Sequence, residues 1–181
     1  MNYTLTNAVA GYCFSLCFAL NAHAQTSKEH EILKKDVGTW TAECKMWVAG
    51  PDADPIVSPG KETNRLLPGG NWLLSEFESE FGGEKFTGHG TFGYEPEKKK
   101  YVGSWVDSMS PYMMMMEGTY DDKTKTMTMF YTAKDPAGNE ANGKTVCVTK
   151  DEKTRVFTMY MQARESKDKF VKMMEITYHK K

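Results

Sequence analysis

The chain has 181 residues, with 23 basic side chains, 24 acidic side chains and a formal net charge of −1. That length fits a single domain. The balanced charge argues against a nucleic-acid-binding protein, which typically carries a basic excess. Hydrophobic residues make up 40% of the chain and aromatic residues 12%, which is enough to form a core and excludes a chain that is disordered throughout.

The N-terminus has the pattern of a secretory signal peptide. Residues 8–20 carry no charge and are mostly apolar, but they are too few to cross a bilayer, which takes about 20 residues. Ala22-His23-Ala24 follows as a small-x-small cleavage pattern. We therefore expect residues 1–24 to be removed, and the mature protein to be periplasmic or secreted with no integral membrane segment. A buried helix or a short membrane anchor is the alternative.

Residues 25–37 are expected to form one short helix or lid before the main domain. Ser27 is placed to cap the helix, and Glu29 and Glu31 would lie in its first turn, where acidic groups suit the helix dipole. Gly38 is expected to end the helix. We expect His30 to lie on its exposed surface.

From residue 38 to residue 181, apolar and polar residues alternate in a way that predicts strands. Trp40, Ala42, Cys44 and Met46 share one face of the first strand. Only residues 50–60 form a longer, proline-rich loop, and short connections make neighbouring strands antiparallel. We therefore expect an all-β fold, an antiparallel up-and-down barrel of about ten strands closed on itself. The expected strands are 38–46, 61–67, 71–81, 85–94, 100–107, 112–120, 125–133, 143–149, 154–164 and 169–179.

Cleavage after Ala24 would leave two cysteines, Cys44 and Cys147. Two cysteines in an exported protein suggest a disulfide. These two, however, fall on the first and eighth predicted strands, which are not neighbours even in a closed barrel. Because cysteines whose Cα atoms lie more than about 7 Å apart cannot be bridged, we expect both thiols to stay free.

Several segments carry a family resemblance. Gly38-Thr39-Trp40 opens the first strand after a short helix, as in lipocalins and their calycin relatives, whose tryptophan packs against a basic residue near the last strand. Lys180 or His179 could be that residue here. The segments 92–95, 101–110, 117–121 and 174–178 resemble the bacterial domain of unknown function 1579 family. The resemblance covers nearly all of residues 32–181. It implies a calycin-like barrel that is frequently exported, and it implies no established activity.

Methionine is the most unusual feature of the composition. The chain has thirteen, including four in a row at 113–116, where a strand would direct two inward and two outward. Methionine side chains fill irregular space and adapt to varied ligands, and a barrel of this size can hold one small ligand. Thioethers are also soft ligands for Cu(I). The methionines are therefore compatible with two functions, an apolar ligand-binding lumen and a Cu(I) carrier.

Two titratable residues are candidates for chemistry. His89 lies between two glycines on a predicted strand; facing inward it could be a general acid or base, or a haem ligand, and facing outward it would be a surface residue. Asp107 follows Trp105 at two residues' spacing. Its carboxylate could transfer a proton or could cap the turn after Ser108.

The sequence therefore predicts a soluble exported barrel that binds a small apolar or amphipathic, lipophilic molecule, with no cofactor and no assigned metal site. The alternatives are a calycin-type isomerase, cyclase or hydrolase that uses His89 and Asp107 as acid and base, or a carrier of haem or Cu(I). The oligomeric state stays open. The residues expected to line or close the lumen are Trp72, Phe92, Trp105, Met113, Met115, Met127, Met129 and Tyr131.

The N-terminus of the purified protein tests the signal peptide. When the full-length chain is expressed in a bacterial host with an export pathway, N-terminal sequencing of the product should begin at Gln25, because Ala24 ends the cleavage pattern. A product that begins at Met1 would contradict the signal peptide.

Overall fold

The computed structural model describes residues 27–134, 138–163, 166 and 168–181. The predicted signal peptide lies outside the described residues. The elements in chain order are α1 (Lys28–Lys34), β1 (Gly38–Met46), β2 (Ile56–Leu66), β3 (Trp72–Phe81), β4 (Glu84–Glu95), β5 (Lys100–Asp107), β6 (Ser110–Asp121), β7 (Thr126–Lys134), β8 (Glu140–Thr149), β9 (Thr154–Gln162) and β10 (Phe170–Lys180).

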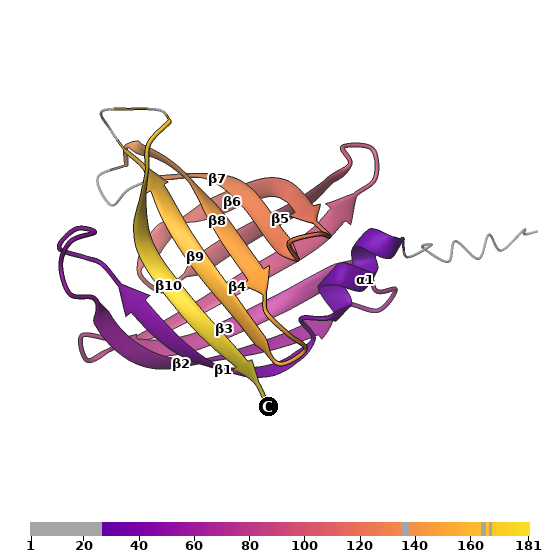
Figure 1. Ribbon diagram of the computed structural model, residues 1–181, viewed down its shortest axis with the longest axis horizontal. Coiled ribbons are helices and arrows are strands. Elements are labelled where there is room, and N and C mark those ends of the chain that lie inside the picture. Colours follow the sequence, from indigo (N-terminus) through magenta and orange to yellow (C-terminus); the bar gives the residue numbers. More distant parts are fainter. Residues whose placement is uncertain (1–26, 135–137, 164–165, 167) are drawn as a thin grey trace, which may run out of the picture.

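The ten strands form one closed antiparallel barrel in which each strand pairs with its neighbours in sequence, and β1 closes the ring against β10. Figure 1 shows this ring, with α1 at one end of the barrel. Short connections favour this meander, and closure leaves no unpaired edge. The predicted all-β up-and-down barrel is confirmed.

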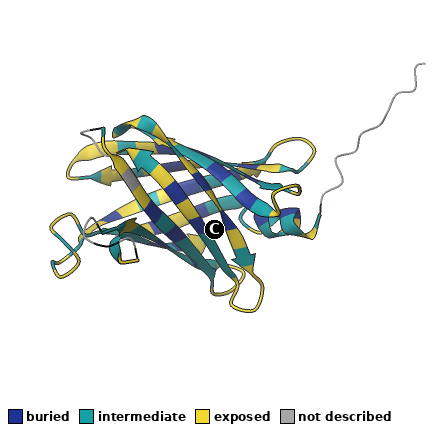
Figure 2. Ribbon diagram, turned by 90° about the horizontal axis from the view of Figure 1, so that it is seen from above, coloured by how far each residue is buried: buried dark blue, intermediate teal, exposed yellow. Residues whose placement is uncertain are grey.

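Alternation along the strands separates the interior from the surface. On β1, Trp40, Ala42 and Cys44 are buried, whereas the residues between them are exposed. Glu76, Glu78 and Glu80 of β3 lie on the exposed face, as their alternation indicates. Figure 2 shows buried and exposed segments alternating along several strands. The two-residue period therefore sets the face of each side chain.

The proline-rich stretch 50–60 is not entirely a loop, as the sequence suggested. Its second half belongs to β2, which begins at Ile56 and pairs with β1 through Pro59. Pairing of β2 with β3 begins only at Gly60. Pro59 is tolerated because proline, which has no N–H to donate, can occupy a strand position that is unpaired on one side.

The helix α1 begins and ends close to the predicted residues, but its histidine is not exposed. His30 is buried, and its Nδ1 accepts a hydrogen bond from the Ser27 backbone N–H at 3.1 Å. Its ring also meets the Tyr94 ring edge-on, with the centroids 6.0 Å apart. The prediction of an exposed His30 was wrong because α1 packs onto the barrel and buries one of its faces. Leu33 of the same helix is part of the core.

Both cysteines of the barrel are free, as expected. Cys44 lies on β1 and Cys147 on β8, with β10 and β9 between them. Burial raises the pKa of the Cys44 thiol to about 11 and that of Cys147 to about 12. Both groups are therefore protonated thiols at neutral pH.

A prediction about close packing follows from Gly118 on β6. A Cβ atom there would lie 1.9 Å from the Thr128 carbonyl oxygen of β7, and a backbone atom cannot move away as a side chain can. Gly118→Ala should therefore lower the free energy of unfolding by about 2 kcal/mol or more, measured by urea denaturation. The control is Thr119→Ala at the next, exposed position. Equal stability of the two variants would contradict the packing.

Candidate functional site

The barrel encloses a cavity of about 560 Å³, which is within the range of small-molecule sites. Its wall includes the apolar side chains Leu73, Phe77 and Ile176. At the end away from α1, where β1 finishes and β6 begins, Val48 and Met109 border the cavity and are 64% and 66% exposed. The interior is therefore continuous with an apolar rim at that end.

Nine of the thirteen methionines line this cavity. Within the run 113–116, Met114 and Met116 face the cavity, whereas Met113 and Met115 are each 58% exposed. The alternation was predicted, but the inward pair was chosen wrongly. The lining methionines are Met46, Met109, Met114, Met116, Met127, Met129, Met159, Met173 and Met174.

Glycines in β4 and β5 make room for the aromatic part of the wall. A Cβ at Gly88 would lie 2.2 Å from the Trp105 ring, and a Cβ at Gly103 would lie 2.6 Å from the Phe92 ring. The two rings thus occupy space over the neighbouring strands that a Cβ atom would otherwise fill. Phe92 and Trp105 both border the cavity, as do Met127 and Met129.

Two other residues that were expected to line or close the lumen are not part of the cavity wall. Trp72 is 37% exposed, on the opposite face of β3 from the buried Leu73. Tyr131 is buried in the core but is not part of the cavity wall. Its hydroxyl donates to the Tyr160 carbonyl oxygen at 2.9 Å, and burial raises the pKa of this phenol to about 12.

The structure does not bring His89 and Asp107 together on one face. His89 is exposed, whereas Asp107 borders the cavity. Asp107 accepts hydrogen bonds from Trp105 Nε1 at 3.1 Å and from the Met109 N–H at 2.9 Å. It thus caps the turn between β5 and β6, which is one of the two roles expected for it. The exposed His89 ring does not reach the lumen.

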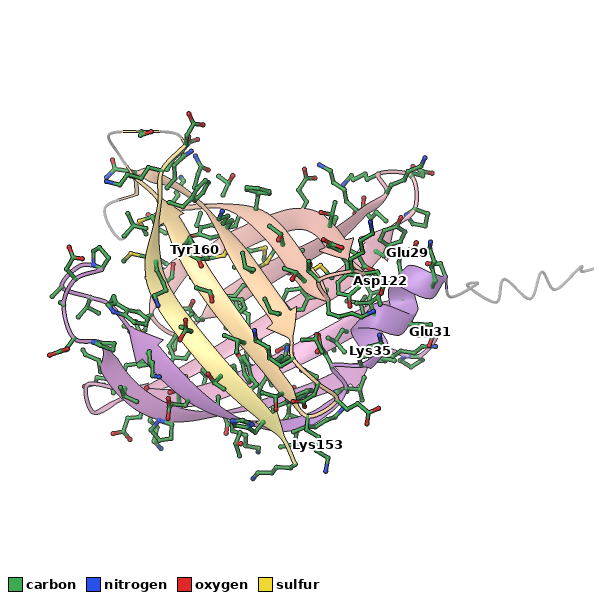
Figure 3. All side chains as sticks on the ribbon, in the orientation of Figure 1. Glu29, Glu31, Lys35, Asp122, Lys153 and Tyr160 are labelled. Carbon is green, nitrogen blue, oxygen red and sulfur yellow. The ribbon has the colours of Figure 1, made fainter. Side chains whose placement is uncertain are left out.

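The lumen ends at the α1 side in a group of polar side chains that we call the polar floor: the half-buried Asp36 and the buried Glu62, Asn64 and Arg155. All four border the cavity. The Arg155 guanidinium forms an ion pair with Glu62 and a second with Asp36, where Nη1 and Oδ1 are 3.5 Å apart. Lys153 and Tyr160, labelled in Figure 3, lie near opposite ends of β9, and Arg155 is close to the Lys153 end.

Two aromatic rings hold the Arg155 cation. Its guanidinium carbon lies 4.6 Å from the centroid of Trp40 and 4.3 Å from that of Tyr178. Tyr178 is directly opposite Arg155 across β10 and β9. Such contacts are strongest where water is excluded. Lys180 also lies over the Trp40 ring, at 5.1 Å, so it takes the position that the family resemblance implied, whereas His179 is exposed.

The same floor fixes the end of α1. The Asp36 carbonyl oxygen accepts hydrogen bonds from Trp40 Nε1 at 2.9 Å and from Asn64 Nδ2 at 3.0 Å. Lys180 Nζ donates to the Lys35 carbonyl oxygen at 3.0 Å. Gly38 has a φ of +126°, which suits glycine and lets the chain turn from the helix into β1. The C-terminal end of the helix is therefore held to the barrel by hydrogen bonds to the carbonyl groups just after its last residue.

The charges of the polar floor are set by burial and by one another. Burial disfavours the charged guanidinium, but Asp36 and Glu62 outweigh this effect and hold the pKa of Arg155 above its usual value. Burial raises the pKa of the Asp36 carboxyl, while the Arg155 charge acts in the opposite direction. Burial likewise raises the pKa of Tyr178 well above its usual value. Arg155 is therefore a permanent cation beside two carboxyl groups.

The polar floor was not predicted from the sequence. Arg155 has the same parity as Phe157 and Met159, which were expected to share one face, so a buried cation could have been inferred there. No comparable signal marks Glu62 and Asn64, because the charges and apolar residues around them do not show which face is inward.

Two features are absent from the described part of the chain. In residues 27–134, 138–163, 166 and 168–181, no helix has both the length and the apolar composition needed to cross a bilayer. Within the same described residues, no group of three or more His, Cys, Asp or Glu side chains is arranged to hold a metal ion.

The closed ten-strand meander with one short helix is a lipocalin-like, or calycin, barrel. Among solved structures it is similar to the S-type phycobiliprotein lyase CPES from Guillardia theta, with a TM-score of 0.54 and 11% identity over 88% of this chain and 95% of that chain. At that identity the likeness shows the fold.

The family model described as "Protein of unknown function (DUF1579)" matches residues 25–180. The chain therefore belongs to this family, as its motifs predicted. No match is found among curated proteins.

A prediction tests the polar floor. Glu62→Gln removes the nearer counter-charge of a buried guanidinium, and breaking a buried ion pair costs about 3 kcal/mol or more. We expect a loss of that size in the free energy of unfolding at pH 7, measured by urea denaturation. Glu76→Gln, at an exposed position of β3, should change it by less than about 0.5 kcal/mol. Similar losses in both variants would be incompatible with the ion pair.

Proposed function

We propose that the mature protein is an exported carrier that binds one small apolar or amphipathic molecule in the barrel lumen. The observation that carries this proposal is the cavity of about 560 Å³ with its wall of methionine and aromatic side chains. Concave sites of this volume, mostly apolar and with a few polar groups, are the usual form of small-molecule sites.

The methionine lining favours an adaptable pocket over a rigid one. The nine thioethers are spread over β1, β6, β7, β9, β10 and the turn at Met109. Unbranched side chains with polarisable sulfur can rearrange around ligands of different shapes. A hydrophobic core built for stability alone would more typically use leucine, isoleucine and valine.

Export is supported by the sequence of the N-terminus rather than by the barrel. Residues 8–20 are uncharged and mostly apolar, and the small-x-small pattern at 22–24 follows them. A carrier outside the cytoplasm would keep a poorly soluble molecule away from water within the lumen.

The test is a titration with N-phenyl-1-naphthylamine, an uncharged apolar probe whose fluorescence rises in an apolar site. We expect saturable binding at one site per chain. Met114→Trp places a larger, aromatic side chain in the lumen. The volume it takes up should weaken probe binding by about tenfold or more.

The control is Met113→Trp at the neighbouring position, which is exposed and outside the cavity wall. Its affinity for the probe should match that of the parent, and circular dichroism should show both variants folded. The absence of saturable binding by the parent would overturn the carrier proposal, as would equal affinities in the two variants.

A further inference from the structure

Two buried polar atoms of the polar floor have no hydrogen-bond partner among the described residues: Arg155 Nε and Asn64 Oδ1. Arg155 is 8% exposed and Asn64 is 3% exposed. Buried polar groups are nearly always paired, so each such atom calls for a missing partner. One of the two is a donor and the other is an acceptor.

The other polar atoms of both side chains already have partners. The Asn64 amide nitrogen donates to the Asp36 carbonyl oxygen and to Glu62 Oε1, which fixes the orientation of the amide and leaves Oδ1 as the unused acceptor. The terminal nitrogens of Arg155 form ion pairs with Asp36 and Glu62, which leaves Nε. Because Glu62 Oε1 receives a hydrogen bond from each side chain, both unpaired atoms belong to one connected cluster.

Both side chains border the cavity, so a molecule in the lumen would lie against this cluster. We propose that the carried molecule has an apolar body and a hydroxyl group, and that this hydroxyl accepts a hydrogen bond from Arg155 Nε and donates one to Asn64 Oδ1. This inference rests on the proposed carrier function and adds the chemical class of the ligand.

The charges of the floor favour a neutral hydroxyl over a carboxylate. The single guanidinium already faces the carboxyl groups of Asp36 and Glu62. An anionic head group would add another negative charge beside them, and like charges in a site of low dielectric repel strongly. It would also have no hydrogen to donate to Asn64 Oδ1. An ether oxygen could accept from Arg155 but likewise could not donate to Asn64.

The experiment compares three probes with the same ten-carbon chain: 1-decanol, decyl methyl ether and decanoate. Each competes with bound N-phenyl-1-naphthylamine at pH 7.5 and constant ionic strength. We expect 1-decanol to bind about tenfold more tightly than the other two, the size of effect that one well-formed hydrogen bond typically produces.

A substitution locates the effect. Arg155→Lys keeps the positive charge but removes Nε, so it should abolish most of the preference for 1-decanol over decyl methyl ether. Arg65→Lys makes the same change at an exposed position of β2 next to Asn64, and its preference should match that of the parent. If thermal unfolding shows that Arg155→Lys does not fold, the three-probe comparison on the parent still decides.

The two proposals fail in different ways. If none of the three probes displaces the fluorophore and the fluorophore itself shows no saturable binding, the carrier function is wrong and the inference falls with it. If the probes bind with equal affinity, the carrier function stands and the head-group inference is overturned, because the lumen then shows no preference for a group that can pair with both atoms. Tightest binding by decanoate would also overturn it.

Discussion

The buried cation of Arg155 is the constraint on which the α1 end of the barrel depends. A guanidinium removed from water must be paired, and here four successive strands of the ring each contribute to it. β9 supplies Arg155, β10 supplies Tyr178, β1 supplies Trp40 and β2 supplies Glu62. Since β1 and β10 come from opposite ends of the chain, the same contacts that satisfy the charge also hold the barrel closed.

The polar floor in turn covers the α1 end of the cavity. Asp36 pairs with Arg155 through its carboxyl group and anchors Trp40 through its carbonyl oxygen, which holds α1 across that end. The apolar wall then runs from the floor to the exposed rim at Met109. A molecule in this lumen would have its apolar part against the methionines and its polar part at the floor, as the chemistry of an amphipathic ligand requires.

Much of the fold could be predicted from the sequence, because the two-residue period and the short connections are local signals. It was harder to predict which face of each strand points into the barrel. Four consecutive methionines look alike in sequence, and only their pairing with neighbouring strands decides that Met114 faces inward and Met113 outward. The polar floor brings together residues that are up to 119 positions apart in the sequence, Asp36 and Arg155. It also depends on the burial of charged side chains, which their residue type does not indicate. The prediction of an exposed His30 was wrong for the same reason, because the packing of α1 onto the barrel is a tertiary contact that local sequence does not show.

The central claim is that the lumen holds a molecule whose polar end lies on the floor. The most direct measurement is a high-resolution crystal structure of the protein purified from its own host without detergent. Our account predicts elongated density along the methionine wall, with one end within hydrogen-bond distance of Arg155 Nε and Asn64 Oδ1. A lumen filled by the protein's own side chains, or one holding only ordered water, would contradict it.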